Sequence, residues 1–471
     1  MVRMTIATLL IPFGCLTLCA QSSKPQAHLP SAPVATGTLL FAAAQEPAPT
    51  ATMQQIPPAS TTAPTTLTRQ QAEQIALANN PGIHVGQLLA KAEHEVVRQT
   101  RSSELPNLNG DLTAVEAEEG SRISAGSLAA SRLVEHAGAG VQLRQLITDF
   151  GHTRNLVASA KLNEKARQAD AEATRADIIL ATDQVFYQVL QAQATLKVAQ
   201  QTVTARQTLV DQVSALTSAK LKSDLDLSFV QVNLSQAKLL ELDAQNNLNA
   251  AKAALDAVLG YDHAMNYTLV PDSGDLPALP PAVDPLIVSA IQNRPDLQSL
   301  QWSEQSAQKF SRAQHEQFLP TISALGVVGR TPVGSSQYFN TNWYGAVGMN
   351  MSVPVFNGFR YAAEASEASL RAKAATEQTR ALRDQVVRDV RTAWLNAKTA
   401  LQRVTVTDEL LRQANLALSL SQTRYKLGLS SIVELSQAQL QQTQAAIGSA
   451  NARSQYGFAM STLRFQTGVR P

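Results

Sequence analysis

The chain contains little charge and almost no cysteine. Of its 471 residues 16% are charged, and 39 Lys and Arg against 37 Asp and Glu leave a formal net charge of +2. A nearly neutral chain offers no basic surface that would favour nucleic acid as a partner. Both cysteines, Cys15 and Cys19, lie in an N-terminal segment that resembles a signal peptide. We therefore expect no disulfide bond in the mature protein.

The sequence also lacks the motifs of common catalytic and cofactor sites. Its seven histidines show no zinc-ligand spacing, and no glycine-rich phosphate loop or nucleophile elbow is present. We expect no enzymatic activity and no bound cofactor or metal.

The N-terminus has the pattern of a secretory signal peptide. Arg3 precedes an apolar run, residues 4–18, which is too short to span a bilayer and is followed by Cys19-Ala20. We expect cleavage after Ala20, so that residues 1–20 are removed, with lipidation of Cys19 as the alternative. Residues 21–66 are rich in Pro, Ala, Ser, Thr and Gln without any period, which predicts a disordered extension.

The chain then repeats itself. IALANNPGI (Ile75–Ile83) is echoed by SAIQNRPDL (Ser289–Leu297), with Pro81 and Pro295 214 positions apart. The same offset relates Pro106 to Pro320. Further on, matching Phe150-Gly151 to Phe356-Asn357 and Lys220-Leu221 to Lys426-Leu427 gives an offset of 206, hence eight residues fewer in the second copy. We assign repeats to residues 67–270 and 284–471, joined by a Pro-rich linker, 271–283.

Each repeat predicts the order helix, helix, two strands, long helix, helix. Thr68 and Gln71 predict a capping box for the first helix. That helix breaks near Asn79, and Asn80 caps a new one with Pro81 at its first position. In the second repeat Asp284-Pro285 is the start signal, and Arg294 before Pro295 is a weaker cap.

Alternation of apolar and polar residues predicts four strands, after Pro106 and Pro320 at the hairpin starts, over residues 107–118, 137–149, 321–331 and 342–356. The first three place Leu108 and Leu112, Val141 and Leu143, and Ile322 and Val328 on their apolar faces. The apolar face of the last strand carries Trp343, Val347, Met349, Met351 and Val353. Their length and one-sided apolar character suit a bilayer.

Two segments without proline or glycine, from His152 to about Lys220 and from Arg360 to Leu427, predict helices of roughly 100 Å each. Helices of this length must pack along one another in a coiled-coil-like array. Two shorter helices, 80–104 and 226–258, together span about 88 Å. We therefore expect one long helix beside two short ones placed end to end.

This pattern resembles the TolC-like outer-membrane channel family. The resemblance spans residues 67–468 and rests on the repeated Asn-x-Pro phrase, the Leu-Pro hairpin starts, PVFNGFR (354–360) and YKLGLSSIVELSQAQL (425–440). It implies a mainly α fold with a membrane β-barrel: a homotrimer whose subunits each give four strands to one twelve-stranded barrel in outer membrane lipid. Its helices form a periplasmic tunnel, served by a periplasmic adaptor and an inner-membrane pump of RND or ABC type.

The resemblance implies that the two helix turns dock the adaptor. The second turn, Lys426–Ser430, contains Gly428, which can take a positive φ, while the first has none. Exposed leucines favour docking over plain interhelical turns, and the predicted docking residues are Leu221, Lys222, Ser223, Asp224, Leu427, Gly428, Leu429 and Ser430.

The resemblance also places a pore-narrowing carboxylate at Glu434, with the uncharged Gln437 at a second such position. Of the family's charged latch, Tyr425 is present, while Ser430 and Ser228 occupy the other two positions. We therefore predict a weaker, hydrogen-bonded closure, with a solvated surface carboxylate as the alternative for Glu434.

The sequence leaves one functional alternative open within the channel interpretation and another outside it. Within the channel interpretation, small-molecule efflux is favoured over type I protein secretion. Outside it, a secreted structural trimeric coiled-coil stalk or adhesin would explain the long helices but neither the paired hairpins nor the duplication. The acidic stretch 116–119 is expected at an external hairpin tip.

Overall fold

A computed structural model describes residues 65–115, 122–123, 131–132, 136–270, 276–333 and 343–469. All of them fall in one structural unit, Thr62–Pro471. The expected signal peptide and the acidic stretch 116–119 lie outside the described residues.

The order of elements predicted for each repeat is confirmed. The first repeat contains α1 (Arg69–Asn79), α2 (Pro81–Arg101), the 3-10 turn η1 (Ser102–Glu104), β2 (Asn107–Val115), β5 (His136–Thr148), α3 (His152–Ser218) and α4 (Asp224–Leu259). The second contains α5 (Asp284–Asn293), α6 (Pro295–Glu316), β7 (Thr321–Val333), β8 (Trp343–Ser352), α7 (Arg360–Lys426) and α8 (Ile432–Thr467). Two further strands of two residues each, β3 (Arg122–Ile123) and β4 (Ser131–Arg132), pair with each other.

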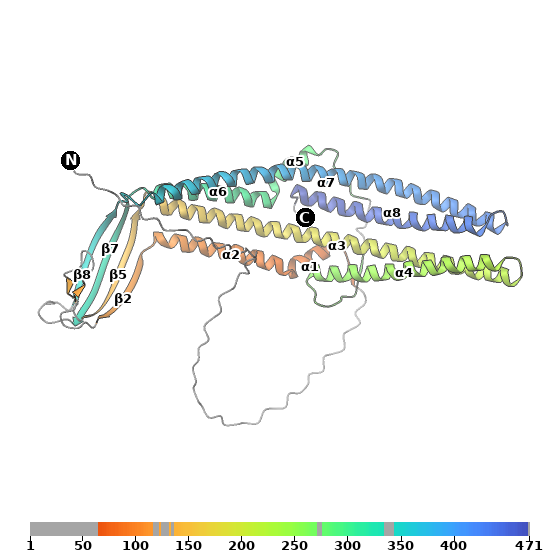
Figure 1. Cartoon of the computed structure of the whole chain (residues 1–471), viewed down its shortest axis with the longest axis horizontal. Coiled ribbons are helices and arrows are strands. Elements are labelled where there is room, and N and C mark those ends of the chain that lie inside the picture. The colour runs from red at the N-terminus through yellow and green to blue at the C-terminus, as the bar shows by residue number, and fades with distance from the viewer. Residues whose placement is uncertain are drawn as a thin grey trace, which may run out of the picture. The chain divides into compact units, whose positions relative to one another are not determined.

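The helices have the arrangement expected from their lengths. Each long helix, α3 and α7, has 67 residues and therefore spans about 100 Å. α2 and α4 follow each other along α3, and α6 and α8 follow each other along α7 (Figure 1). The sheet lies at one end of the helices, and the α3–α4 and α7–α8 turns lie at the other (Figure 1). Contacts of α3 with α6 and α8 join the two repeats.

The backbone corrects the register of the duplication. Positive φ angles recur at Phe150 and Gly358, Gly151 and Phe359, Lys220 and Gly428, and Gly260 and Gly468, each pair 208 positions apart. The ends of α3 and α7 obey the same offset. The predicted offset of 206 is therefore wrong, and the second copy is six residues shorter rather than eight. Matching Phe150-Gly151 to Phe356-Asn357 followed side-chain identity, whereas the left-handed turn that starts the long helix lies at Gly358-Phe359.

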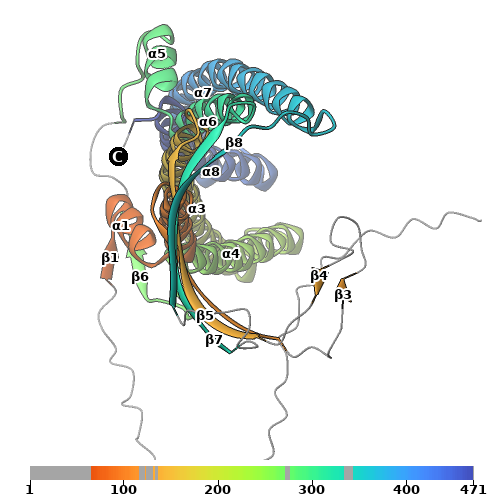
Figure 2. The same ribbon diagram turned by 90° about the vertical axis from the view of Figure 1, so that its left-hand side faces the viewer.

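The hairpins form one antiparallel four-stranded sheet in the order β2-β5-β7-β8. Its register puts the apolar rows on one face, because Leu108 lies opposite Leu143, Leu143 opposite Gly326, and Gly326 opposite Val347. The strands form a curved wall when seen from the sheet end (Figure 2). β8 ends at Ser352 instead of residue 356, since Pro354 cannot donate a ladder hydrogen bond. Val353 therefore follows the strand, with 52% of its surface exposed.

The restart of the first repeat's helices is built by Asn80 and Pro81. Asn80 Oδ1 accepts a hydrogen bond from Gly82 N at 2.8 Å, and Asn80 Nδ2 donates to the Val258 carbonyl on α4 at 3.3 Å. Thr68 and Gln71 form the capping box of α1. At Pro295, Arg294 makes no side-chain cap, and Asp284 lies inside the first turn of α5 with Val283 before it.

The expected extension ends earlier than residue 66. Residues Thr65–Leu67 form β1, which pairs in parallel with β6 (Tyr267–Leu269) at the end of the first repeat. A strand of three residues is too short to produce a recognisable alternation, so the sequence did not predict it.

The described helices pack around separate apolar clusters. In the first repeat, α1, α3 and α4 bury Ala76, Phe186 and Leu255, each 0% exposed. In the second, α7 and α8 enclose Tyr456, which is also 0% exposed. Burying a side chain of the size of Phe186 or Leu255 contributes about 1.5–3 kcal/mol. Within the described ranges, no helix is both long and apolar enough to cross a membrane.

Candidate functional site at the helix tips

Each long helix ends in a tight turn made by one residue with a positive φ. In the α7–α8 turn this residue is Gly428, with φ of 72°. In the α3–α4 turn it is Lys220, with φ of 53°, although a side chain disfavours this conformation. Ser223 then caps α4 and Asp224 is the first residue of that helix, so these two predicted turn residues belong to the helix start.

An apolar cluster closes the space between the four helices just behind these turns. It contains Leu209, Val213, Val230, Tyr425, Ile432 and Leu435. Tyr425 on α7 is 8% exposed, and Lys222 Nζ from the other turn lies 4.6 Å from the centre of its ring. Burial, and after it the charge of Asp226, raises the pKa of Tyr425. The structure thus brings together a predicted gate residue and a predicted docking residue through packing.

The predicted hydrogen-bonded latch is not formed within one chain. Among the described residues, the buried Tyr425 Oη and Ser430 Oγ have no hydrogen-bond partner. Ser228 is exposed on α4, and Gln437 is exposed on α8. Glu434 lies in the first turn of α8, where its Oε1 is 3.4 Å from Arg424 Nε of α7. Arg424 also donates to the Leu429 carbonyl at 3.3 Å and so braces the turn.

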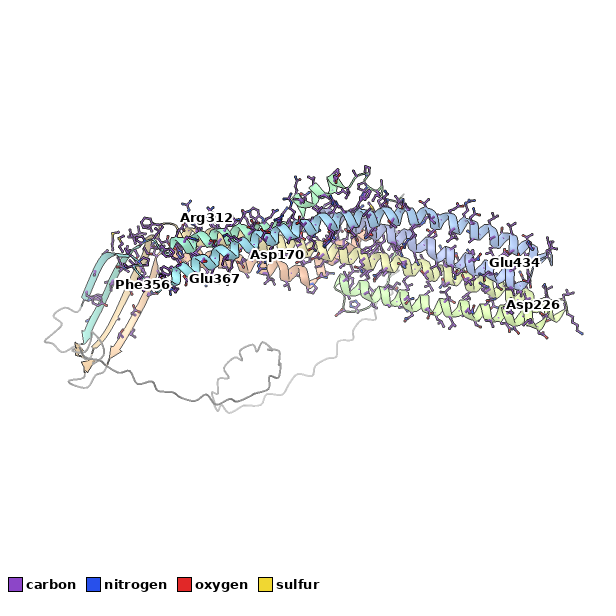
Figure 3. The ribbon with its side chains drawn as sticks, turned by 45° about the horizontal axis from the view of Figure 1, so that its top comes forward. Asp170, Asp226, Arg312, Phe356, Glu367 and Glu434 are labelled. Carbon is purple, nitrogen blue, oxygen red and sulfur yellow. The ribbon has the colours of Figure 1, made fainter. Side chains whose placement is uncertain are left out.

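Two charged residues of this region were missed by the sequence reasoning. Arg424 is the ion-pair partner of Glu434, and Asp226 is the equivalent of Glu434 at the corrected offset of 208. Figure 3 places Asp226 and Glu434 at the tip end, far from Phe356 beside the sheet. The sequence contains a signal for the equivalence of Asp226 and Glu434. Ser223 stands three positions before Asp226, Ser431 stands three positions before Glu434, and each serine caps its helix.

The outer surface of the turns is apolar. Leu221, Leu427 and Leu429 are 70%, 68% and 66% exposed, and Lys222 is partly buried against Tyr425. At the opposite end of the helices, the sheet presents a second apolar surface, where Val347 and Met349 are 92% and 71% exposed. Trp343 and Met351 lie in the same row, at 67% and 58%. Exposed apolar surface of this kind marks contact with a partner or a membrane.

Comparison with known proteins identifies the family. The outer membrane efflux protein family matches residues 73–261 and 286–469, one segment in each repeat. The chain belongs to this family. It is 23% identical over 415 residues to the outer membrane protein TolC of Salmonella enteritidis, covering 85% of this chain and 81% of TolC. The Escherichia coli K12 TolC is 24% identical over 405 residues, covering 82% and 79%.

Solved structures share the fold. The outer membrane protein VceC of Vibrio cholerae superimposes with a TM-score of 0.72 at 18% identity, covering 85% of this chain and 96% of VceC. The Campylobacter jejuni CmeC outer membrane channel gives 0.74 at 17%, covering 85% of both chains. The predicted TolC-like fold and the predicted outer-membrane localisation, with the helices in the periplasm, are thereby confirmed for this efflux protein.

Proposed function

We propose that the protein is a homotrimeric channel and a passive conduit from the periplasm to the exterior, without a catalytic step. The supporting observation is the four-stranded sheet, whose edge strands β2 and β8 have no partner on their outer sides within the described chain. Unpaired backbone groups in lipid each cost several kcal/mol, so the edges must be joined to other copies. Three copies would give one barrel of about twelve strands.

The helices would then form the periplasmic tunnel of the same trimer. α3 and α7 run from the sheet to the tips, so three copies would place about six long helices around one axis. Closure at the tips is assigned to the apolar cluster around Tyr425, with Glu434 and Gln437 on α8 facing the narrowed pore. Asp226 adds a second acidic position to this gate.

The tips are the proposed docking surface of a periplasmic adaptor, which in turn connects the channel to an inner-membrane pump of RND or ABC type. The exposed Leu221, Leu427 and Leu429 support this role, because an exposed apolar patch at the far end of two turns is typical of a surface that contacts a partner. The efflux description of the family supports small-molecule export over type I protein secretion.

The test of the channel proposal uses the full chain extracted from outer membranes in detergent. Light scattering should report a trimer, and planar bilayers containing it should conduct ions. A water-soluble filament without conductance would overturn the proposal in favour of the coiled-coil stalk or adhesin. For docking, a photocrosslinker attached to Leu427→Cys should capture an adaptor, whereas one at Leu395→Cys, 55% exposed in mid-helix, should not. Equal capture at both positions would overturn the docking site.

A further inference from the structure

A group of three buried charged side chains lies where α1 packs against the middle of α3. Arg69 and Glu73 stand one turn apart on α1, and Asp183 faces them from α3; their exposed fractions are 9%, 6% and 3%. Arg69 Nη1 bonds to Glu73 Oε1 and lies 3.5 Å from Asp183 Oδ2. One guanidinium nitrogen thus lies against both buried carboxyl groups. Two like charges held this close together away from solvent favour the binding of a proton by one of them.

We propose that Glu73 and Asp183 bind one proton between them, and that this proton fastens α1 to α3. With the proton bound, the two carboxyl groups carry a single negative charge, which Arg69 neutralises. Without it, a second negative charge is buried beside the first, and the two like charges repel each other.

The unsatisfied atoms agree with a shared proton. Asp183 Oδ1 is buried and receives no hydrogen bond from a donor group in the described part of the chain. A hydroxyl on the Glu73 carboxyl would supply that donor. Burial first, and then the hydrogen bond and charge of Asp183, raise the pKa of Glu73 to about 7, against the opposing charges of Arg69 and Arg464.

The surroundings allow the proton to exchange with solvent. Glu73 and Asp183 line a cavity of about 600 Å³, whose other charged groups are Arg69 from α1, Arg175 from α3 and Arg464 from α8. The remaining neighbour of α1 is α4, which contributes the apolar Leu255 and Leu259 to the shared cluster. Among the described residues that line the cavity, Glu73 and Asp183 are the acidic ones.

The second repeat shows that the fold itself does not require these charges. At the offset of 214, Val283 and Ile287 replace Arg69 and Glu73. Ile287 packs there with Val386 and Val390, both 0% exposed, so the buried part of this contact is apolar. At the offset of 208, Asp183 corresponds to Arg391, which is exposed. Apolar residues of similar volume usually stabilise such a contact as well as buried ions do. Buried charges thus join α1 to α3 in the first repeat, whereas apolar residues join α5 to α7 in the second. Only the charged contact can bind a proton.

The sign of the pH dependence follows from the raised pKa. The unfolded chain loses the Glu73 proton near the ordinary value of 4.5, whereas the folded chain keeps it up to about 7. The Glu73 contribution to stability is therefore fully present below pH 4.5, declines as the pH rises, and is lost above about 7. Across that window the folding equilibrium should fall by about three hundredfold relative to a variant that cannot titrate.

The test is infrared difference spectroscopy of the full chain in detergent between about pH 5.5 and about pH 8.5. The wild type should lose a protonated-carboxyl band with a midpoint near 7, Glu73→Gln should lack this transition, and Asp183→Asn should move it to lower pH. Asp177→Asn serves as the control, because the pKa of Asp177 is also raised by burial and by Asp296 but lies outside the pair. Persistence of the transition in Glu73→Gln, or its absence in the wild type, would overturn the proposal.

A second measurement reports the fastening itself. The thermal midpoint of the wild type should fall relative to Glu73→Gln as the pH rises from about 4.5 to about 7.5. The triple variant Arg69→Val, Glu73→Ile, Asp183→Ala, which makes this contact apolar, should fold and show a flat profile. Parallel pH profiles in the wild type and Glu73→Gln would show that no proton fastens α1.

Discussion

Replacement of Tyr425 decides what closes the helix tips. Its ring is 8% exposed within the apolar cluster of α3, α4, α7 and α8, while its hydroxyl is buried without a partner in the described chain. Tyr425→Phe keeps the ring and removes an unsatisfied polar group, which should leave closure unchanged or strengthen it by about 1 kcal/mol. Tyr425→Ala removes the ring and leaves a cavity, which should destabilise the tip by about 3–5 kcal/mol.

The assay is the leak conductance of the purified protein in planar bilayers, combined with the rate of trypsin cleavage at the tip turns. Tyr425→Ala should increase both, and Tyr425→Phe should increase neither. Tyr456→Phe is the matched control, because the Tyr456 hydroxyl donates to the Pro277 carbonyl; its loss should lower overall stability by about 1 kcal/mol without a leak. A leak in Tyr425→Phe as large as in Tyr425→Ala would refute closure by packing and restore the hydrogen-bonded latch.

Three further predictions concern the sheet, the gate and the turns. Val347→Lys, on the apolar row of β8, should lower the stability of the membrane-inserted protein by about 2–4 kcal/mol, while Ala346→Lys on the opposite face should change it little; urea unfolding in lipid vesicles measures both. Glu434→Gln alone should change the leak conductance little, because the carboxylate is an exposed partner of Arg424; a large increase in bilayer recordings would contradict this. Lys220→Gly should raise the thermal midpoint and Gly428→Ala should lower it, each by an amount equivalent to about 1 kcal/mol, as calorimetry would show.

Much of the architecture could be predicted from the sequence because helices and strands leave simple patterns in the order of the residues. The absence of proline and glycine from 152–218 and 360–426 identified both long helices, and alternation identified the four strands. The Asn80-Pro81 junction was readable because a cap and a helix-starting proline are local chemistry.

The remaining features depend on backbone conformation or on contacts between distant segments. The register of the two repeats was misjudged by two positions because Phe150 and Phe356 look alike, while the left-handed residue that must correspond to Phe150 is Gly358. Lys220 in a positive-φ turn carries no sequence signal, since lysine disfavours that region. Burial of Glu73 and Asp183 likewise could not be foreseen, because acidic residues on a helix are usually solvated.

The equal lengths of corresponding helices limit how this gene can change. α3 and α7 have 67 residues each, α4 and α8 have 36 each, and the whole six-residue difference falls between the hairpin start and the long helix. One residue inserted into a long helix would move its tip by about 1.5 Å and rotate everything beyond by about 100°. The two tips would then differ in level, and their buried faces would no longer meet. Insertions and deletions should therefore accumulate in the outer hairpin loops and be purged from the helices, even where the helix sequence itself varies freely.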